Sequence, residues 1–361
     1  MSRRLSREIK RDCLLTIFFC LVVSQVQGAK FDFVALGDTA YNLPDDLPVY
    51  EALIKKINQS KPAFSIHVGD TWGGVYCSEE NHLWVKEWFQ KYDHPVLYTP
   101  GDNEWTDCRK QDLLDAYKKM LAKTASKEDM MLLQQSQSFE NSFNGIEFED
   151  SLASLNLIRK IFFSESYSLG EKKIPVLQQS KVSDFISMAE NLRWQKDNVV
   201  FATVNVPGSE MNFTINNLKR AKEAILRNEA DVAWIKETFD HAQAENSKAV
   251  VIALHAGLFV EGDGGSFSNK LLRGGTGGAY YWIARAIRDE ADKFARPVLL
   301  INGDFHDLII DRPFMVSQSE GEQPRYANIT RLQVYGAPEM KAVRVSVDTD
   351  TEWVFSFSPL Y

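Results

Sequence analysis

Cysteine and long apolar runs are both scarce in this sequence. Only four of the 361 residues are cysteine. The longest apolar stretch, residues 14–23, has about ten residues, roughly half of what a membrane-spanning helix requires. Five Lys or Arg residues precede it, and Val26 and Gly28 follow it. We interpret residues 1–28 as a secretory signal cleaved before Ala29, which predicts a secreted or periplasmic protein without a transmembrane segment; an uncleaved anchor is the alternative.

The chain also lacks a long run of basic residues. It has 41 Lys and Arg residues against 49 Asp and Glu residues, and its formal net charge at pH 7 is −8. A broad electrostatic face for nucleic acid is therefore not expected. Hydrophobic residues at 44% and charged residues at 25% are ordinary globular values,. The length suffices for one large α/β domain or two smaller ones.

Two signatures of nucleophilic catalysis are missing or weak. The sequence has no G-x-S-x-G motif, which argues against a serine hydrolase. Cys77 and Cys108 are the two cysteines that remain without the signal, and in an oxidising compartment they predict one disulfide. They follow two Gly-Asp pairs by similar distances, which favours the pairing. Two unpaired buried thiols are the alternative.

Apolar segments rich in β-branched and aromatic residues predict strands that end on polar side chains. Amphipathic helical segments, such as 49–58 and 216–242, lie between them and indicate a layered α/β fold. Ligands of open α/β sheets bind beyond the carboxyl ends of the strands, so we expect these side chains to gather at one edge of one sheet. The segments are 33–36 before Asp38, 64–68 before Asp70, 96–99 before Asp102, 249–254 before His255, and 298–301 before Asp304 and His306.

The end of the chain predicts three further strands. Residues 329–336, 341–348 and 352–358 alternate between apolar and polar side chains, with no helical segment between them,. We expect them to form an antiparallel finish to the fold.

The side chains at the strand ends predict a metal site. Carboxylate oxygens and imidazole nitrogens are ligands of Mn²⁺, Fe and Zn²⁺. Two such ions about 4 Å apart can clamp the attacking and leaving oxygens of a phosphoryl displacement. A single Gly-Asp pair after a strand is most often a plain turn, but five such strand ends in chain order favour a metal site.

The order of these residues resembles the calcineurin-like metallophosphoesterases. The motifs of that family are D-x-H, G-D, G-N-H-[DE], a strand-terminal His and G-H-x-H. The stretches 101–108 and 192–194 also look like a secreted branch of the family. The resemblance implies a four-layer α/β/β/α sandwich over residues 29–361, with a mainly helical insertion at about 109–190. The matching residues here are Gly37-Asp38, Gly69-Asp70, Gly101-Asp102-Asn103-Glu104, His255 and Gly303-Asp304-Phe305-His306.

Several family positions hold different side chains. Ala40 stands where the family has its first His and cannot bind a metal, although the adjacent Tyr41 could replace it. Asp102 and Asp304 stand in place of an Asn and a His ligand. Asn103 stands in place of the catalytic His, and it can donate a hydrogen bond but cannot supply a proton. The resulting set is more anionic than the family norm and favours Mn²⁺, Mg²⁺ or Ca²⁺ over Zn²⁺.

The resemblance implies two divalent ions (Mn, Fe, Mg or Zn) and a set of roles. Asn103 would contact the phosphate, and Glu104 would orient its loop. The implied function is hydrolysis of a small-molecule or head-group phosphate ester by a metal-activated hydroxide. A non-catalytic protein with this fold and a binding or structural role is the alternative. The implied ligands are Asp38 and His306 for the first ion, Asp70 as the catalytic bridge, and Asp102, His255 and Asp304 for the second.

Overall fold

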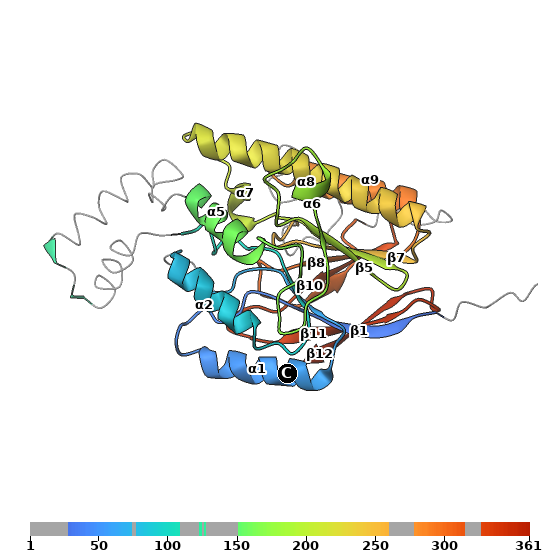
Figure 1. The fold of residues 1–361 in the computed structure, drawn as a ribbon, viewed down its shortest axis with the longest axis horizontal. Helices are drawn as coiled ribbons and strands as arrows, with labels where there is room; N and C mark the ends of the chain where they lie inside the picture. Colours follow the sequence, from blue (N-terminus) through green and yellow to red (C-terminus); the bar gives the residue numbers. More distant parts are fainter. Residues whose placement is uncertain are drawn as a thin grey trace, which may run out of the picture.

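The computed structural model describes residues 28–73, 77–108, 123–124, 126–127, 151–259, 278–314 and 326–361. The predicted signal lies outside the described residues except for Gly28, and so does most of 109–150 in the predicted insertion. Two β-sheets and their covering helices make up the described part (Figure 1). No helix within it is long and apolar enough to cross a membrane.

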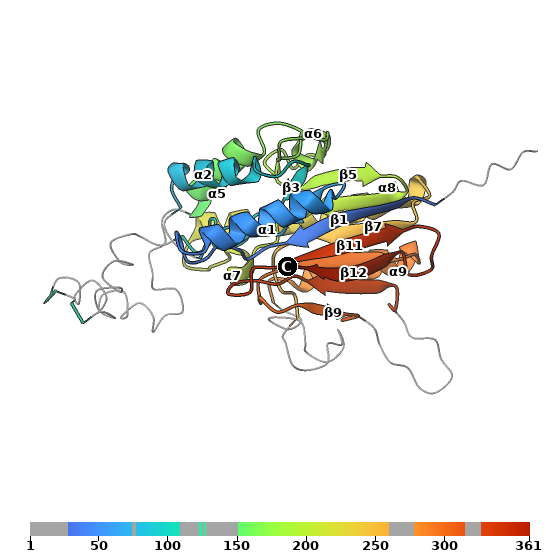
Figure 2. The same cartoon turned by 90° about the horizontal axis from the view of Figure 1, so that it is seen from below.

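The first sheet has five strands in the order β12-β11-β1-β2-β3. Strands β1, β2 and β3 are parallel, and β11 is antiparallel to both β1 and β12. Figure 2 shows β1, β11 and β12 side by side, with α1 next to β1. The bounds are β1 Lys30–Leu36, β2 Ser65–His67, β3 Val96–Tyr98, β11 Ala342–Asp348 and β12 Phe355–Leu360.

The second sheet has seven strands in the order β4-β5-β6-β7-β8-β10-β9. Its centre, from β6 to β10, is parallel, and both edges are antiparallel. Every residue of β6, β7 and β8 is buried, as expected for parallel strands covered on both faces,. The bounds are β4 Leu177–Gln178, β5 Leu192–Lys196, β6 Val199–Thr203, β7 Ala249–Ala253, β8 Val298–Asn302, β9 Ile309–Asp311 and β10 Ile329–Gln333.

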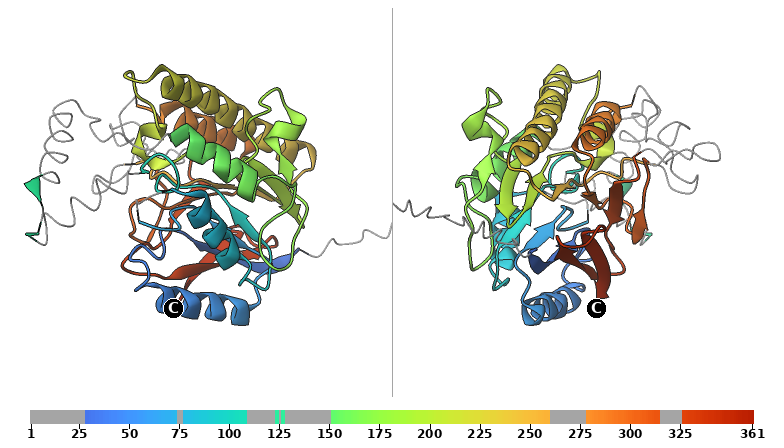
Figure 3. Two further views of the ribbon diagram at one scale, coloured as in Figure 1. Left: turned by 60° about the vertical axis from the view of Figure 1, so that its left-hand side comes forward. Right: turned by 90° about the vertical axis from the view of Figure 1, so that its right-hand side faces the viewer.

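Helices cover the outer face of each sheet (Figures 1 and 3). Helix α1 covers the outer face of the first sheet. Helices α8 and α9 cover the outer face of the second sheet, on the opposite side of the molecule. Helix α5 packs against α2. The bounds are α1 Leu47–Ser60, α2 Glu79–Phe89, α5 Ser151–Phe162, α6 Gln179–Val182, α7 Gly208–Met211, α8 Leu218–Ala244 and α9 Tyr281–Phe294.

An aromatic core joins the two sheets. The ring of Phe201 on β6 lies 5.1 Å from that of Phe64 and 5.6 Å from that of Phe33 on β1, measured between ring centres. The neighbours of Phe201 on the strand, Val200 and Ala202, point the other way into the core under α8 and α9,. Each face of the second sheet is therefore buried, and the predicted α/β/β/α layering is confirmed.

Two of the expected strand arrangements are wrong. The five site-bearing strands do not share one sheet, because β1, β2 and β3 belong to the first sheet and β7 and β8 to the second. The last three strands do not form one antiparallel unit, because β10 pairs in parallel with β8 whereas β11 and β12 close the first sheet. Alternation along a strand defines its two faces but not its pairing partner, which is set by contacts distant in sequence.

Candidate metal centre

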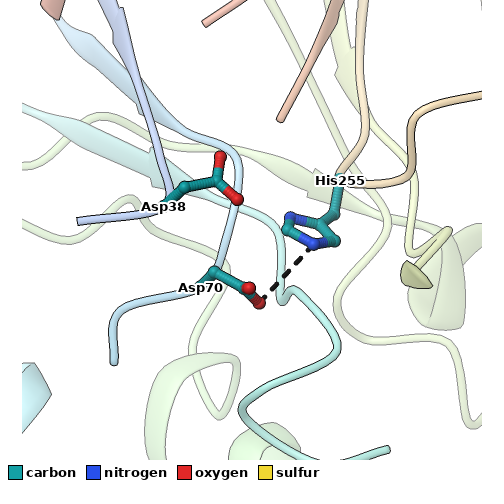
Figure 4. A group of neighbouring side chains, drawn as sticks. All are labelled: Asp38, Asp70 and His255. Atoms are coloured by element: carbon teal, nitrogen blue, oxygen red, sulfur yellow. Dashed lines mark ion pairs between the residues drawn. The ribbon is translucent and has the colours of Figure 1, made fainter. Parts of the chain in front are cut away.

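The carboxyl ends of strands from both sheets meet in one buried cluster. Ligand atoms of Asp38, Asp70 and His255 lie within 4.8 Å of one another (Figure 4). Ligand atoms of Asp102, His255 and Asp304 do the same. His255 belongs to both groups, so five of the six residues predicted as metal ligands form one continuous cluster.

The imidazoles reach these carboxylates through one nitrogen each. Nε2 of His255 lies 3.5 Å from Oδ1 of both Asp70 and Asp102. Nε2 of His306, the sixth predicted ligand, lies 3.6 Å from Oδ1 of Asp38. The other nitrogen of each ring, Nδ1, lies 2.8 Å from the Val68 carbonyl in His255 and 2.7 Å from the Ala337 carbonyl in His306. A carbonyl only accepts, so Nδ1 carries the proton and Nε2 of a neutral ring presents its lone pair to the cluster.

Two buried atoms in the cluster lack a hydrogen-bond partner within the described part of the chain. These are Oδ2 of Asp38 and Nε2 of His255, and both residues are fully buried. An unpaired carboxylate oxygen and an unpaired imidazole nitrogen are costly to bury, because each loses its hydration without compensation. A divalent cation would satisfy both, so the donor set fits a metal ion.

The pKa values describe the same accumulation of negative charge. Burial raises the pKa of Asp38 to about 7 and raises the pKa of Asp70 well above its usual value. Burial opposes the charged form of His255, but the nearby carboxylates outweigh it and raise the pKa of that ring. Burial also opposes the charged form of Asp102, but His255 and Ser209 hold its pKa at about 2. Without a cation the cluster therefore retains protons, which a bound metal would displace.

The backbone at the site adopts conformations that are unusual for these residues. The φ angles of Asp38, Asp70, Asp304 and His306 are 51°, 53°, 79° and 66°. Such left-handed residues cost of order 1–3 kcal/mol each and cluster at functional sites. Position 101 requires glycine because of space: a Cβ atom there would overlap the carboxylate of Asp70.

Glu104 holds two of the ligand loops together. Its buried carboxylate accepts hydrogen bonds from the backbone N–H of Asp70 at 3.1 Å, Thr71 at 2.7 Å and Gly101 at 2.9 Å. It also accepts one from the Thr71 hydroxyl at 2.8 Å. These contacts agree with the role expected for Glu104, which is to orient the loop.

A disulfide closes the same pair of loops. Cys77 and Cys108 are bonded, with Cα atoms 5.4 Å apart. The predicted pairing is confirmed, and the alternative of two unpaired buried thiols is wrong.

Asn103 and Tyr41 both contact Asp70. The side-chain amide of Asn103 donates to Oδ2 of Asp70 at 2.7 Å, and its backbone N–H donates to Oδ1 at 3.0 Å. The Tyr41 hydroxyl donates to the same Oδ2 at 2.5 Å and lies 3.1 Å from Nε2 of His306. Next to it, Ala40 is buried and presents no ligand atom. Tyr41 thus lies between two of the predicted ligands.

Ser209 is a site residue that the sequence reasoning missed. Its hydroxyl lies 3.0 Å from Oδ2 of Asp102 and 2.7 Å from Oδ1 of Asp107. It follows β6, so it also lies beyond the carboxyl end of a strand. A search restricted to carboxylates and imidazoles could not find a serine, although the Pro-Gly-Ser sequence after a predicted strand was a usable signal.

The segment that carries Ser209, labelled α7, is a left-handed turn. The φ angles of Ser209, Glu210, Met211 and Asn212 lie between 47° and 62°. The buried Arg227 on α8 donates to the carbonyl of Met211 at 2.6 Å, which fixes the turn. A run of left-handed residues costs roughly 1–2 kcal/mol per residue, so the turn requires this support.

Comparisons with solved structures give distant matches. No protein-family model and no curated protein matches the sequence. Among solved structures, one match is GAP50, the anchor in the inner membrane complex of Plasmodium, with 9% identity and a TM-score of 0.42 over 92% of this chain and 88% of that one. Another is PhoD, with 10% identity and a TM-score of 0.45 over 90% of this chain and 65% of that one. The site is therefore assigned from its own geometry.

Proposed function

We propose that this protein is a metal-dependent phosphoesterase with two adjacent ion sites. The observation that carries the proposal is the cluster of carboxylates and imidazoles at the strand ends, in which Oδ2 of Asp38 and Nε2 of His255 are buried without a hydrogen-bond partner among the described residues. Two close, oxygen-rich cation sites are suited to phosphoryl transfer, since both the attacking and the leaving oxygen need charge neutralisation.

The proposed ligand assignment keeps the second group, Asp102, His255 and Asp304, together and adds His306 to Asp38. Tyr41, beside His306 and Asp70, is a further candidate ligand in the position that Ala40 leaves without one. When bound, divalent ions lower the pKa of a coordinated water and offset the charge of the phosphate. The proposed ligands are Asp38 and His306 for one ion, Asp102, His255 and Asp304 for the other, and Asp70 between them.

The remaining side chains would bind and orient the substrate. The amide of Asn103 faces Asp70 and can donate a hydrogen bond to a phosphate oxygen. Asn103 cannot protonate a leaving group, and the loss of a general acid costs about 10²–10⁴-fold in rate. Esters with good leaving groups, such as nitrophenyl phosphates, would therefore be turned over far better than alkyl esters.

A non-catalytic binding protein remains the second candidate function. Asn103 and Ala40 favour it, because they stand where the resembled family has a catalytic and a ligating histidine. A metal-binding protein of this kind would hold ions in the same cluster without turning over any ester.

The test combines metal content with turnover. Elemental analysis of the purified protein should find two divalent ions per chain, and bis- and mono-p-nitrophenyl phosphate should be hydrolysed when Mn²⁺, Fe²⁺, Zn²⁺ or Mg²⁺ is added back. Asp70→Asn should abolish turnover and lower the metal content, whereas the exposed Asp184→Asn should change neither.

Two outcomes would contradict the proposal. Retained turnover in a folded Asp70→Asn protein would remove Asp70 from its bridging role. Bound metal without turnover of either ester under any ion would leave the binding protein as the better description.

We also propose that the chain is exported, with residues 1–28 as the signal. The disulfide between Cys77 and Cys108 supports this, since disulfides persist in oxidising compartments,. The substrate would then be a phosphate ester outside the cytoplasm.

A further inference from the structure

A large cavity lies next to the left-handed turn that carries Ser209. Its volume is about 830 Å³, which is in the range of small-molecule sites,. It is bounded by the left-handed turn, by α8 and by the start of α9; Figure 1 shows α7 beside α8. The lining residues are Glu210, Met211, Phe213, Ala224, Ile225, Asn228, Glu229, Val232, Gly278, Ala279 and Trp282.

The left-handed turn joins this cavity to the metal ligands. At one end of the turn, Gly208 lies so close that a Cβ atom there would overlap the Asp102 carboxylate, and the Ser209 hydroxyl bonds to the same residue. The next two residues, Glu210 and Met211, line the cavity. The same short turn thus contacts a predicted metal ligand with Gly208 and Ser209 and lines the cavity with the two residues that follow.

The lining favours a positive charge within an apolar environment. Glu210 and Glu229 supply two carboxylates, and no Lys or Arg is among the described residues that line the cavity. Neither carboxylate forms an ion pair with another described residue. Oδ1 of Asn228 is buried without a hydrogen-bond partner in the described part, so the cavity also offers an unused acceptor.

Two aromatic rings are also among the described residues of the lining. Phe213 and Trp282 are 42% and 53% exposed. The faces of such rings attract cations, most strongly in tryptophan. Trp282 already forms a cation–π contact, since the guanidinium carbon of Arg285 lies 5.4 Å from the ring centre. Arg285 is not part of the lining, and its charge is paired with Asp289 at 3.3 Å.

We propose that this cavity binds the ammonium end of an amino alcohol whose hydroxyl is esterified by the phosphate at the metal centre. The proposal rests on the proposed phosphoesterase function and adds a substrate class to it. The ammonium N–H groups would donate to Glu210, Glu229 and Asn228, and the alkyl portion would contact the aromatic and aliphatic lining. The substrate would thus be zwitterionic, with its phosphate at the cations and its ammonium at the carboxylates.

The test measures binding of the alcohol alone to metal-free protein, so that it does not depend on catalysis. The two probes are 5-aminopentan-1-ol and hexan-1-ol, which have the same number of heavy atoms and differ by an ammonium in place of a methyl group. Calorimetry or ligand-observed NMR should give a dissociation constant about tenfold lower for the amine, equivalent to about 1.4 kcal/mol. The double variant Glu210→Gln/Glu229→Gln should remove this preference, and Glu245→Gln at the exposed end of α8 should retain it.

Three outcomes of the binding test would overturn the proposal. Equal binding of both probes would make the cavity apolar without a cation site, and binding of neither would leave it without this ligand. A preference that survives in the double variant would place the ammonium elsewhere. If the protein prefers the amine but hydrolyses no phosphate ester, the ammonium site in the cavity is supported and the phosphoesterase function is refuted. If it hydrolyses phosphate esters but does not prefer the amine, the phosphoesterase function is supported and the ammonium site is refuted.

Discussion

Replacing Glu104 by Gln tests whether one buried carboxylate organises the candidate metal centre. The glutamine is nearly isosteric, but one of its two terminal atoms becomes an NH₂ group that cannot accept. In the structure each carboxylate oxygen accepts two hydrogen bonds: Oε2 accepts from the backbone of Asp70 and Gly101, and Oε1 accepts from the N–H and hydroxyl of Thr71. An NH₂ group in place of Oε2 leaves two backbone N–H donors without an acceptor. An NH₂ group in place of Oε1 leaves only the Thr71 N–H without one, because the Thr71 hydroxyl can rotate and accept from the NH₂ group,.

The size of the effect follows from the less costly orientation, which leaves one donor without an acceptor. A buried polar group left without a partner costs about 1–3 kcal/mol, so Glu104→Gln should lower the free energy of unfolding by about that amount. Because the broken contact holds Thr71 next to Asp70, metal affinity should also fall, by about 10–100-fold as for other residues that orient metal ligands,.

The assay is urea unfolding followed by tryptophan fluorescence, together with metal titration of the folded protein. Glu245→Gln is the matched control, since that residue is exposed beyond the end of α8. A Glu104→Gln protein that unfolds within about 0.5 kcal/mol of the parent, the range of neutral surface changes, would refute the reasoning. The expected decrease in stability with an unchanged metal affinity would also refute it, since Glu104 would then not position Asp70.

Two further predictions concern stability and export. Glu190 is fully buried and paired with Arg159 at 2.6 Å; burial alone would raise its pKa, but the charge and hydrogen bonds of Arg159 hold it below the usual value. The ionised Glu190 therefore stabilises the fold fully above the unfolded-state pKa of about 4.3, and this stabilisation is lost as the pH falls through the lower folded-state pKa. Glu190→Gln should lower the free energy of unfolding by about 3–5 kcal/mol at pH 7. It should also flatten the acid limb of a plot of stability against pH. For export, mass spectrometry of protein recovered outside the cytoplasm should find a chain that begins at Ala29, and a chain that retains residues 1–28 would contradict signal cleavage.

Local pattern was enough to predict most elements and the location of the site. The helix expected at 49–58 is α1 at Leu47–Ser60, and the one expected at 216–242 is α8 at Leu218–Ala244. Both have apolar residues at helical spacing, which is a property of the local sequence. The clustering of Asp38, Asp70 and His255 could also be predicted, since polar residues after buried strands collect at strand ends,.

The parts that sequence could not supply depend on contacts distant along the chain. The first sheet is closed when β11 returns to β1, where Phe33 pairs with Val345. No local feature separates β10 from β11, yet they enter different sheets. Ser209 reaches Asp102 only because the left-handed turn is fixed by Arg227 from another element. Long-range pairing and strained backbone are properties of the packed protein, so pattern alone does not reveal them.

His255 belongs to both ligand groups, so the two ion sites of the proposed phosphoesterase would compete for it. Nδ1 is committed to the Val68 carbonyl, so the ring has a single lone pair, at Nε2, and a lone pair serves one cation at a time. An ion that takes His255 with Asp102 and Asp304 leaves the Asp38 group to rely on His306. If the protein holds two ions as proposed, occupancy of one site would change the affinity of the other, and a metal titration would report two linked equilibria rather than two independent ones.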